Sequence, residues 1–138
     1  MKPIVIFLIS WILFSQDTNM TLDDLKWEYR VVLYFPVEGQ SPLILNDSIQ
    51  HEIEERKIAY FIYGDSVITN LDTSFSPAYL QQVESKYKMG YSDNVYVLIG
   101  LDGGVKMRKE EPLDWENIFR TIDSMPMRQS EIRGGINK

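Results

Sequence analysis

The stretch most suggestive of chemistry is VLIGLDGGVKMR (97–108), in which two glycines precede a basic segment. Phosphate-binding loops combine glycines with a lysine, because backbone N–H groups and the ammonium group hold the phosphate. A P-loop, however, places that lysine directly after its last glycine and before serine or threonine, whereas Val105 intervenes here and methionine follows Lys106. The three-glycine dinucleotide fingerprint is also absent. Asp102 and Gly103 match a tight hairpin turn instead, so we predict a turn.

Thiol and imidazole chemistry are restricted by composition. The chain contains no cysteine, which excludes thiol–disulfide exchange, peroxide reduction through a cysteine and cysteine metal sites. His51 is the only histidine, so no site can have two histidine ligands. It lies off the apolar stripe of its predicted helix, beside Glu52, Glu54 and Glu55, which favours a solvated surface over an acid–base site. A hydrolase that uses carboxylates and His51 is the alternative hypothesis.

Two methionines flank a proline in SMPMRQ, at Met125, Pro126 and Met127. Thioether sulfur is a soft ligand that suits monovalent copper. Since neither cysteine nor histidine lies nearby in the sequence, we interpret Met125 as packing beneath the preceding helix and Pro126 as ending that helix. Asp102 is not followed by the acids of an EF-hand loop. We therefore predict neither a metal nor a cofactor.

Composition and charge restrict the class of protein and its partners. The chain has 138 residues, 44% of them apolar and 25% charged, which is typical of one globular domain. Its formal net charge of -6 disfavours nucleic acid or an anionic membrane as the principal partner.

The N-terminal stretch MKPIVIFLISWILFSQDTNM has the pattern of a secretory signal peptide. Lys2 precedes an apolar run, Ile4 to Phe14, and polar residues follow at once. The run fits a signal-peptide core and is shorter than the ~20 residues that span a bilayer. We predict a signal peptide at 1–16, a single domain at 17–133 and a flexible tail at 134–138, in a secreted or periplasmic protein without a membrane span in its mature part. An N-terminal membrane anchor is the alternative.

The elements that must position these residues alternate between strand and helix patterns. β-branched and aromatic runs predict buried strands at 30–35, 57–65 and 94–100, and VKMR (105–108) alternates like a half-exposed strand. Capping residues followed by apolar repeats predict helices after Thr21, Ser41, Ser76 and Asp114. The order is helix, then β, α, β, α, β, β, α, with the last two strands forming a hairpin. It predicts an α/β sheet with helices on both faces, in the order of the thioredoxin-like fold.

Three segments carry a family resemblance: DLKWEYRVVLYFP (24–36), LIGLDGGVKMRKEEPL (98–113) and IFRTIDSMPMRQSEIR (118–133). They resemble an uncharacterised family of secreted thioredoxin-like domains of the DUF4174 type, also found in animal sushi-repeat and coiled-coil extracellular matrix proteins. The resemblance implies these signature residues: Trp27, Arg30, Asp102, Gly103, Lys106, Arg108, Met125, Pro126, Arg128, Glu131 and Arg133. Asp123 belongs to the same pattern, whereas Leu101 departs from it, since lysine is common there. No particular reaction is implied.

The sequence therefore predicts a non-catalytic exported domain that binds a protein or another envelope or extracellular component. In a thioredoxin-like fold the reactive cysteine follows the first strand, but FPVEGQSPLIL (35–45) contains none, and we interpret Ser41 as a helix cap. The candidate contact residues that we expect to be exposed are Lys106, Arg108, Arg128, Glu131 and Arg133. The alternative is that these charges hold the C-terminal segment to the domain through ion pairs.

Overall fold

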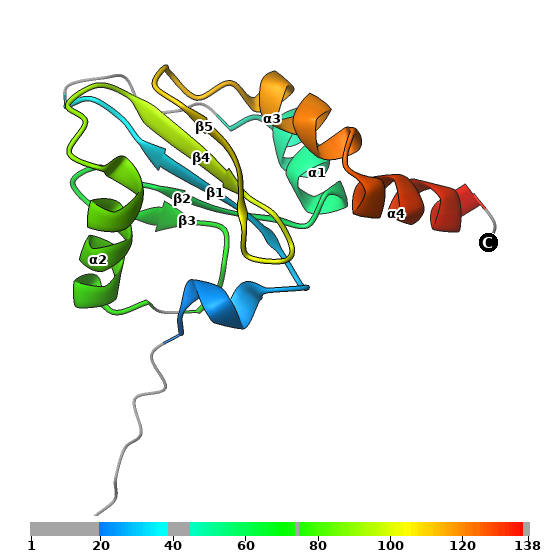
Figure 1. Ribbon diagram of the computed structural model, residues 1–138, viewed down its shortest axis with the longest axis horizontal. Coiled ribbons are helices and arrows are strands. Elements are labelled where there is room, and N and C mark those ends of the chain that lie inside the picture. Colours follow the sequence, from blue (N-terminus) through cyan, green and yellow to red (C-terminus); the bar gives the residue numbers. More distant parts are fainter. Residues whose placement is uncertain (1–19, 39–44, 74, 137–138) are drawn as a thin grey trace, which may run out of the picture.

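A computed structural model describes residues 20–38, 45–73 and 75–136. In these ranges the chain forms a five-stranded sheet with helices on both faces (Figure 1). The predicted signal peptide at 1–16 lies outside the described residues, and so does Ser41.

The elements follow the predicted alternation of strands and helices. In chain order they are the 3-10 helix η1 (Leu22–Leu25), β1 (Arg30–Phe35), α1 (Asp47–Glu55), β2 (Ile58–Ile62), β3 (Ile68–Thr69), α2 (Pro77–Lys88), β4 (Val95–Ile99), β5 (Val105–Lys109), α3 (Trp115–Asp123) and α4 (Pro126–Ile136). The strand order in the sheet is β3-β2-β1-β4-β5. β1 is parallel to β2 and antiparallel to β4, and β5 forms an antiparallel edge. This confirms the mixed α/β class and is compatible with a thioredoxin-like fold.

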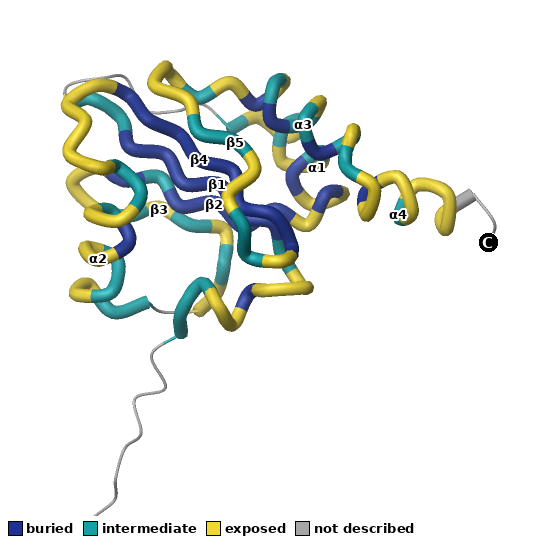
Figure 2. The backbone as a smooth tube through the Cα atoms, viewed as in Figure 1, coloured by how far each residue is buried: buried dark blue, intermediate teal, exposed yellow. Residues whose placement is uncertain are grey.

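Side chains of the central strands alternate between two apolar cores. On one face, Leu33 packs in a cluster with Val83 of α2. On the other face, Tyr34 packs in a cluster with Ile53 of α1 and Ile118 of α3. Figure 2 shows β1 and β4 as buried along their lengths, whereas β5 is intermediate or exposed. Burial on both faces explains why the central strands are continuous apolar runs.

Two helix starts follow the predicted capping chemistry. The side chains of Ser76 and Asp114 accept hydrogen bonds from the backbone N–H groups of Tyr79 and Asn117, at 3.2 and 3.1 Å. These bonds satisfy donors that have no partner inside the helix. The predicted helix start after Ser41 is wrong, because α1 begins at Asp47 behind the cap Asn46.

Two further elements differ from the sequence prediction. β3 has only two residues, too few for a periodic pattern, and lies outside the predicted strands. Pro126 follows the end of α3 as predicted, but it also begins α4, because proline is compatible with the first position of a helix. Residues 134–136, predicted as tail, belong to α4, while 137–138 lie outside the described ranges. No helix in the described part of the chain is long and apolar enough to cross a membrane.

Candidate functional site

The hairpin between β4 and β5 is built by the LDGG segment. Gly103 has φ +80°, a conformation that favours glycine, and its N–H donates to the Gly100 carbonyl at 3.0 Å. The Asp102 carboxylate accepts from the Gly104 N–H at 2.9 Å. A β-bulge follows in the β4–β5 pairing, and β5 then runs antiparallel. The segment therefore forms the predicted turn followed by a strand, not a loop that leads into a helix.

Two lysine side chains lie across the glycines of this hairpin. A Cβ added at Gly103 would meet Lys26 Cε at 2.4 Å, and one added at Gly100 would meet Lys106 Cε at 2.5 Å. The Lys106 ammonium group forms an ion pair with Asp102 at 2.9 Å. The Gly104 N–H and then Lys106 lower the pKa of Asp102. Both lysine side chains thus pack closely over the glycines, and the positive φ of Gly103 favours glycine in the turn.

Trp27 connects η1 to the same hairpin. Its backbone N–H donates to the Leu101 carbonyl at 2.8 Å, and its φ is +67°. Such a backbone is an outlier for a bulky residue. The side chain is nevertheless 66% exposed, while Leu101 is 7% exposed. Trp27 is thus held in an uncommon backbone conformation while its ring faces solvent. Leu101, where the family pattern commonly has lysine, is buried and adds no charge to the turn.

Arg108 is occupied by the end of α2. Its guanidinium group donates to the carbonyls of Tyr87 and Lys88 at 3.4 and 3.1 Å. It also pairs with Glu110 at 2.8 Å and lies 4.9 Å from the centre of the Tyr91 ring. Because the last carbonyls of a helix have no partner inside it, Arg108 acts here as a helix-terminating side chain.

Arg128 and Glu131, two of the predicted contact residues, belong to a buried arginine cluster, which we define as Arg30, Arg56 and Arg128 with the carboxylates of Asp123 and Glu131. The three arginines are 1%, 8% and 5% exposed, so the prediction that Arg128 is exposed is wrong. Arg30 pairs with Glu131 at 3.3 Å, and Arg56 pairs with Asp123 at 2.7 Å. Arg128 reaches both Asp123 and Glu131 at 3.3 Å. These ion pairs hold α4 against the domain, which is the structural alternative that the sequence left open.

The arginines set the protonation of Asp123. Burial alone would raise the pKa of Asp123, but hydrogen bonds and charge attraction from Arg56 and Arg128 outweigh it and hold the pKa below its usual range. Burial likewise opposes the charged form of Arg56, yet Asp123 and Glu52 raise its pKa. Asp123 and Arg56 are therefore both charged at neutral pH, and they form an ion pair.

The remaining predicted residues lie around α4. Met125 packs against the core cluster of α1 and α3, as the sequence suggested, whereas Met127 is exposed. Pro126 begins the helix, and Arg133 lies exposed near its end. Sequence reasoning missed Arg56, although its spacing from Glu52 by one helical turn was a usable signal for an ion pair.

His51, the candidate base of the alternative hypothesis, lies on the surface of the domain. It is exposed on α1, and neither of the two described cavities has it among its lining residues. Within residues 20–38, 45–73 and 75–136, no three His, Asp or Glu side chains lie close enough to hold a metal ion. The geometry gives no support to a hydrolase built on His51.

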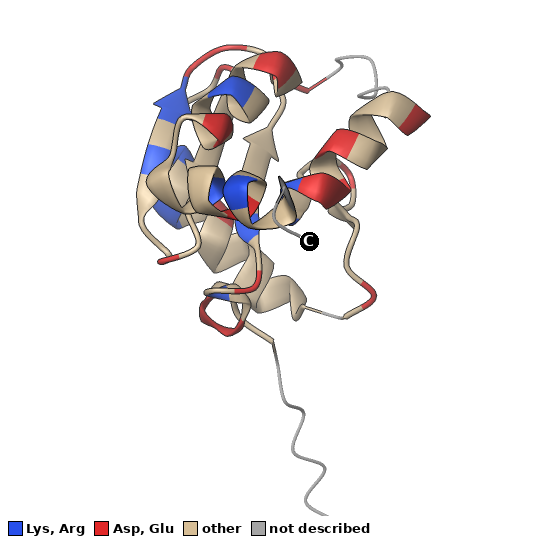
Figure 3. Cartoon of the chain, turned by 90° about the vertical axis from the view of Figure 1, so that its right-hand side faces the viewer, with Lys and Arg blue, Asp and Glu red and all other residues tan. Residues whose placement is uncertain are grey.

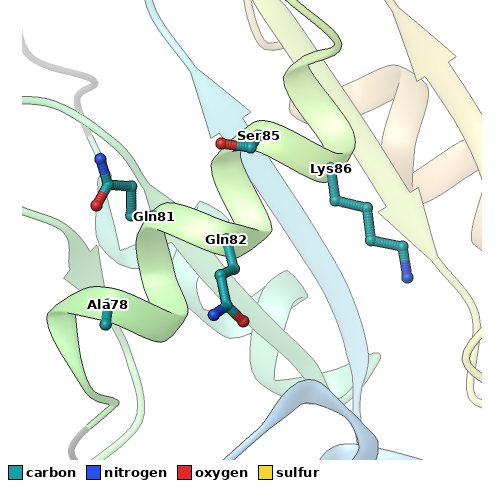
Figure 4. A pocket seen from close by; sticks show the side chains of 5 residues that line it. All are labelled: Ala78, Gln81, Gln82, Ser85 and Lys86. Carbon is teal, nitrogen blue, oxygen red and sulfur yellow. The ribbon is translucent and has the colours of Figure 1, made fainter.

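Two hollows mark the surface on the α2 side. The larger, about 630 Å³, lies along α2, and Figure 4 shows that its described lining side chains, Ala78, Gln81, Gln82, Ser85 and Lys86, come from one helix. The smaller, about 200 Å³, lies where η1, β1, α2 and the hairpin meet. Only the smaller one brings together side chains from several elements, so we regard it as the better candidate for a specific ligand site.

These features define a class: a mixed α/β domain, compatible with a thioredoxin-like fold, that has no thiol. The family model described as "Domain of unknown function (DUF4174)" matches residues 21–131. The chain therefore belongs to this family. No curated protein and no solved structure matches it.

Proposed function

We propose that this protein is exported and acts by binding another protein through its hairpin surface, defined as the exposed side chains of Trp27, Met89, Tyr91, Val105 and Lys106. Export is supported by the apolar N-terminal stretch with the signal-peptide pattern. A binding role is supported by the absence of cysteine, which excludes the thiol chemistry associated with this type of fold.

The observation that carries the binding proposal is a set of exposed apolar side chains along the hairpin. Val105 lies on β5 itself and is 52% exposed. Trp27 is bonded to the hairpin turn through its backbone, and Tyr91 lies beneath Arg108, toward the other end of β5. Exposed apolar side chains along an edge strand suit a protein partner.

Trp27 is the expected centre of this contact. Its left-handed backbone costs free energy, and its exposed ring returns little packing energy to the folded domain. Tryptophan and tyrosine are enriched among the residues that dominate binding energy at protein interfaces. An exposed tryptophan in a strained but hydrogen-bonded conformation is better explained by a partner than by stability.

Photo-crosslinking in the native compartment tests this proposal. A photoreactive amino acid at Val105 should capture one specific protein, and the Trp27→Ala substitution should reduce that capture at least tenfold. Ile68→Ala is the matched control, because Ile68 is 56% exposed but lies on β3, at the opposite edge of the sheet.

Three results would contradict the proposal. Recovery of no specific partner at Val105 would remove the binding role of this surface. Equal capture by the Trp27→Ala and wild-type proteins would show that the tryptophan is not part of it. Detection of the protein only in the cytoplasm, with residues 1–16 still attached, would contradict export.

A further inference from the structure

The cavity of about 200 Å³ is enclosed by parts of the chain that are distant in sequence. Its floor includes Val31 of β1 and Ile99 of β4, which are 2% and 3% exposed. Tyr29 and Tyr87 line it at intermediate exposure. A water molecule takes up about 30 Å³ in the liquid, so the space suits a compact ligand rather than a cofactor of nucleotide size.

The cavity is preorganised because η1 is fastened at both ends. At one end, the Leu22 N–H donates to the Tyr79 hydroxyl of α2 at 2.7 Å. At the other end, the Trp27 N–H donates to the Leu101 carbonyl of the hairpin at 2.8 Å. The wall formed by η1 is therefore fixed to both neighbouring walls before any ligand arrives, which lowers the entropic cost of binding.

The rim of the cavity carries two lysines from different elements. Lys26 follows η1 and pairs with Asp23 at 3.1 Å, where both side chains are exposed. Such a surface pair contributes little and can yield to a competing anion. Lys86 of α2 forms no ion pair with any described residue, and its ammonium group lies 5.2 Å from the centre of the Tyr87 ring. One cation is thus free of carboxylates beside an aromatic wall.

We propose that this cavity binds a small organic anion, with a planar apolar body against Tyr29 and Tyr87 and a carboxylate or phosphate group at Lys26 and Lys86. The rings of Tyr29 and Tyr87 offer the apolar contact for the body, and the two ammonium groups favour the charged head. The Lys26 side chain packs closely over Gly103, whose positive φ favours glycine. The site is distinct from the partner surface of Trp27, whose ring is not part of the lining.

Titration of the purified protein with four probes tests the proposal: phenyl phosphate, benzoate, inorganic phosphate and benzyl alcohol. We expect saturable binding of phenyl phosphate or benzoate, observed by NMR as shifts of the Gly100 and Gly103 amides, and at least tenfold weaker binding of the other two probes. Whichever aromatic anion binds more tightly identifies the head group that the lysines accept.

Lysine variants distinguish specific binding in the cavity from non-specific binding of anions to surface lysines. Lys86→Gln and Lys26→Gln should each weaken the aromatic anion at least fivefold, whereas Lys109→Gln should leave its affinity unchanged, because Lys109 lies on β5 outside the lining. The proposal is overturned if neither aromatic anion saturates a site, if benzyl alcohol binds equally well, or if all three lysine variants weaken binding alike. None of these results bears on partner capture through Trp27.

Discussion

Two groups of basic residues in this domain lie in opposite environments. In the arginine cluster, Arg30, Arg56 and Arg128 are nearly inaccessible and lie among carboxylates from several elements. Along the hairpin, Lys106 and Lys109 stay exposed on an edge strand. In Figure 3, where α4 points toward the viewer, the basic residues of β5 lie along the outside of the molecule.

The difference shows how the chemistry of a cation matches its position. Arginine presents a planar fork of donors, so it can satisfy several carboxylates and carbonyls where water is excluded. Lysine is strongly hydrated and holds its charge in water, which suits an edge strand that must not pair with another copy of itself. The arginines therefore hold α4 to the domain, and the lysines remain available to ligands and partners.

The largest expected effect comes from removing an arginine of the buried cluster. Arg30→Met should lower the free energy of unfolding by about 3 kcal/mol, because the Arg56 carbonyl loses its donor and the Glu131 carboxylate keeps only Arg128. Urea denaturation followed by circular dichroism measures the change. Lys109→Met is the matched control on β5 and should change stability by less than about 0.5 kcal/mol. An equal decrease in the free energy of unfolding in both variants would show that the arginine cluster does not contribute more to stability than the lysines of β5.

The next effect is the contribution of Asp123, in the arginine cluster, to the pH dependence of stability. The pKa of Asp123 is lowered in the folded protein, so its contribution to stability is complete above the ordinary carboxyl pKa and is lost as pH falls through the folded value. Unfolding measured from pH 7 down to pH 3 should show this loss, and Asp123→Asn should reduce its slope. Glu54→Gln, on the exposed side of α1, should leave the slope unchanged. A steeper slope in Asp123→Asn would contradict the direction of the pKa shift.

The fold was predictable because its signals are local. β1 and β4 are apolar runs, and Ser76 with Pro77 and Asp114 begin their helices by side-chain chemistry that is readable from neighbours. β3 was not predictable, since two residues carry no period and its existence depends on pairing with β2. α4 was missed because its apolar residues have little sidedness and two glycines stand near its end.

The site was predictable only in part, because burial of a charge depends on distant partners. The resemblance placed Arg30, Arg128 and Glu131 in one set, and the structure brings those three together. It also grouped Lys106 with them, although that lysine pairs with Asp102 in the hairpin. The cavity beside Lys86 could not be predicted, since its walls come from four elements whose packing no local pattern encodes.

A smaller effect tests whether the strain at Trp27 is kept for function. Trp27→Gly should raise the free energy of unfolding by about 0.5 kcal/mol, because a left-handed backbone costs an ordinary residue ~1–2 kcal/mol and the greater freedom of unfolded glycine offsets part of that gain. Glu28→Gly, at an exposed neighbour whose φ is not positive, should instead destabilise the domain. Denaturation of both variants gives the comparison. Destabilisation by both to the same extent would mean that the Trp27 ring contributes to folding.

The smallest effect is expected at the hairpin ion pair, where Lys106 meets Asp102 in solvent. Substituting Lys106→Ala, Asp102→Asn or both should leave the unfolding temperature of the domain unchanged within error. The exposed ion pair is screened by salt, and both side chains remain hydrated when they separate. A double-mutant cycle at low and high salt measures the coupling. A coupling free energy that is large and insensitive to salt would mean that this pair stabilises the domain as the buried arginine pairs do. If the coupling free energy vanishes at high salt, the Lys106 charge can contact a partner without a loss of stability in the domain.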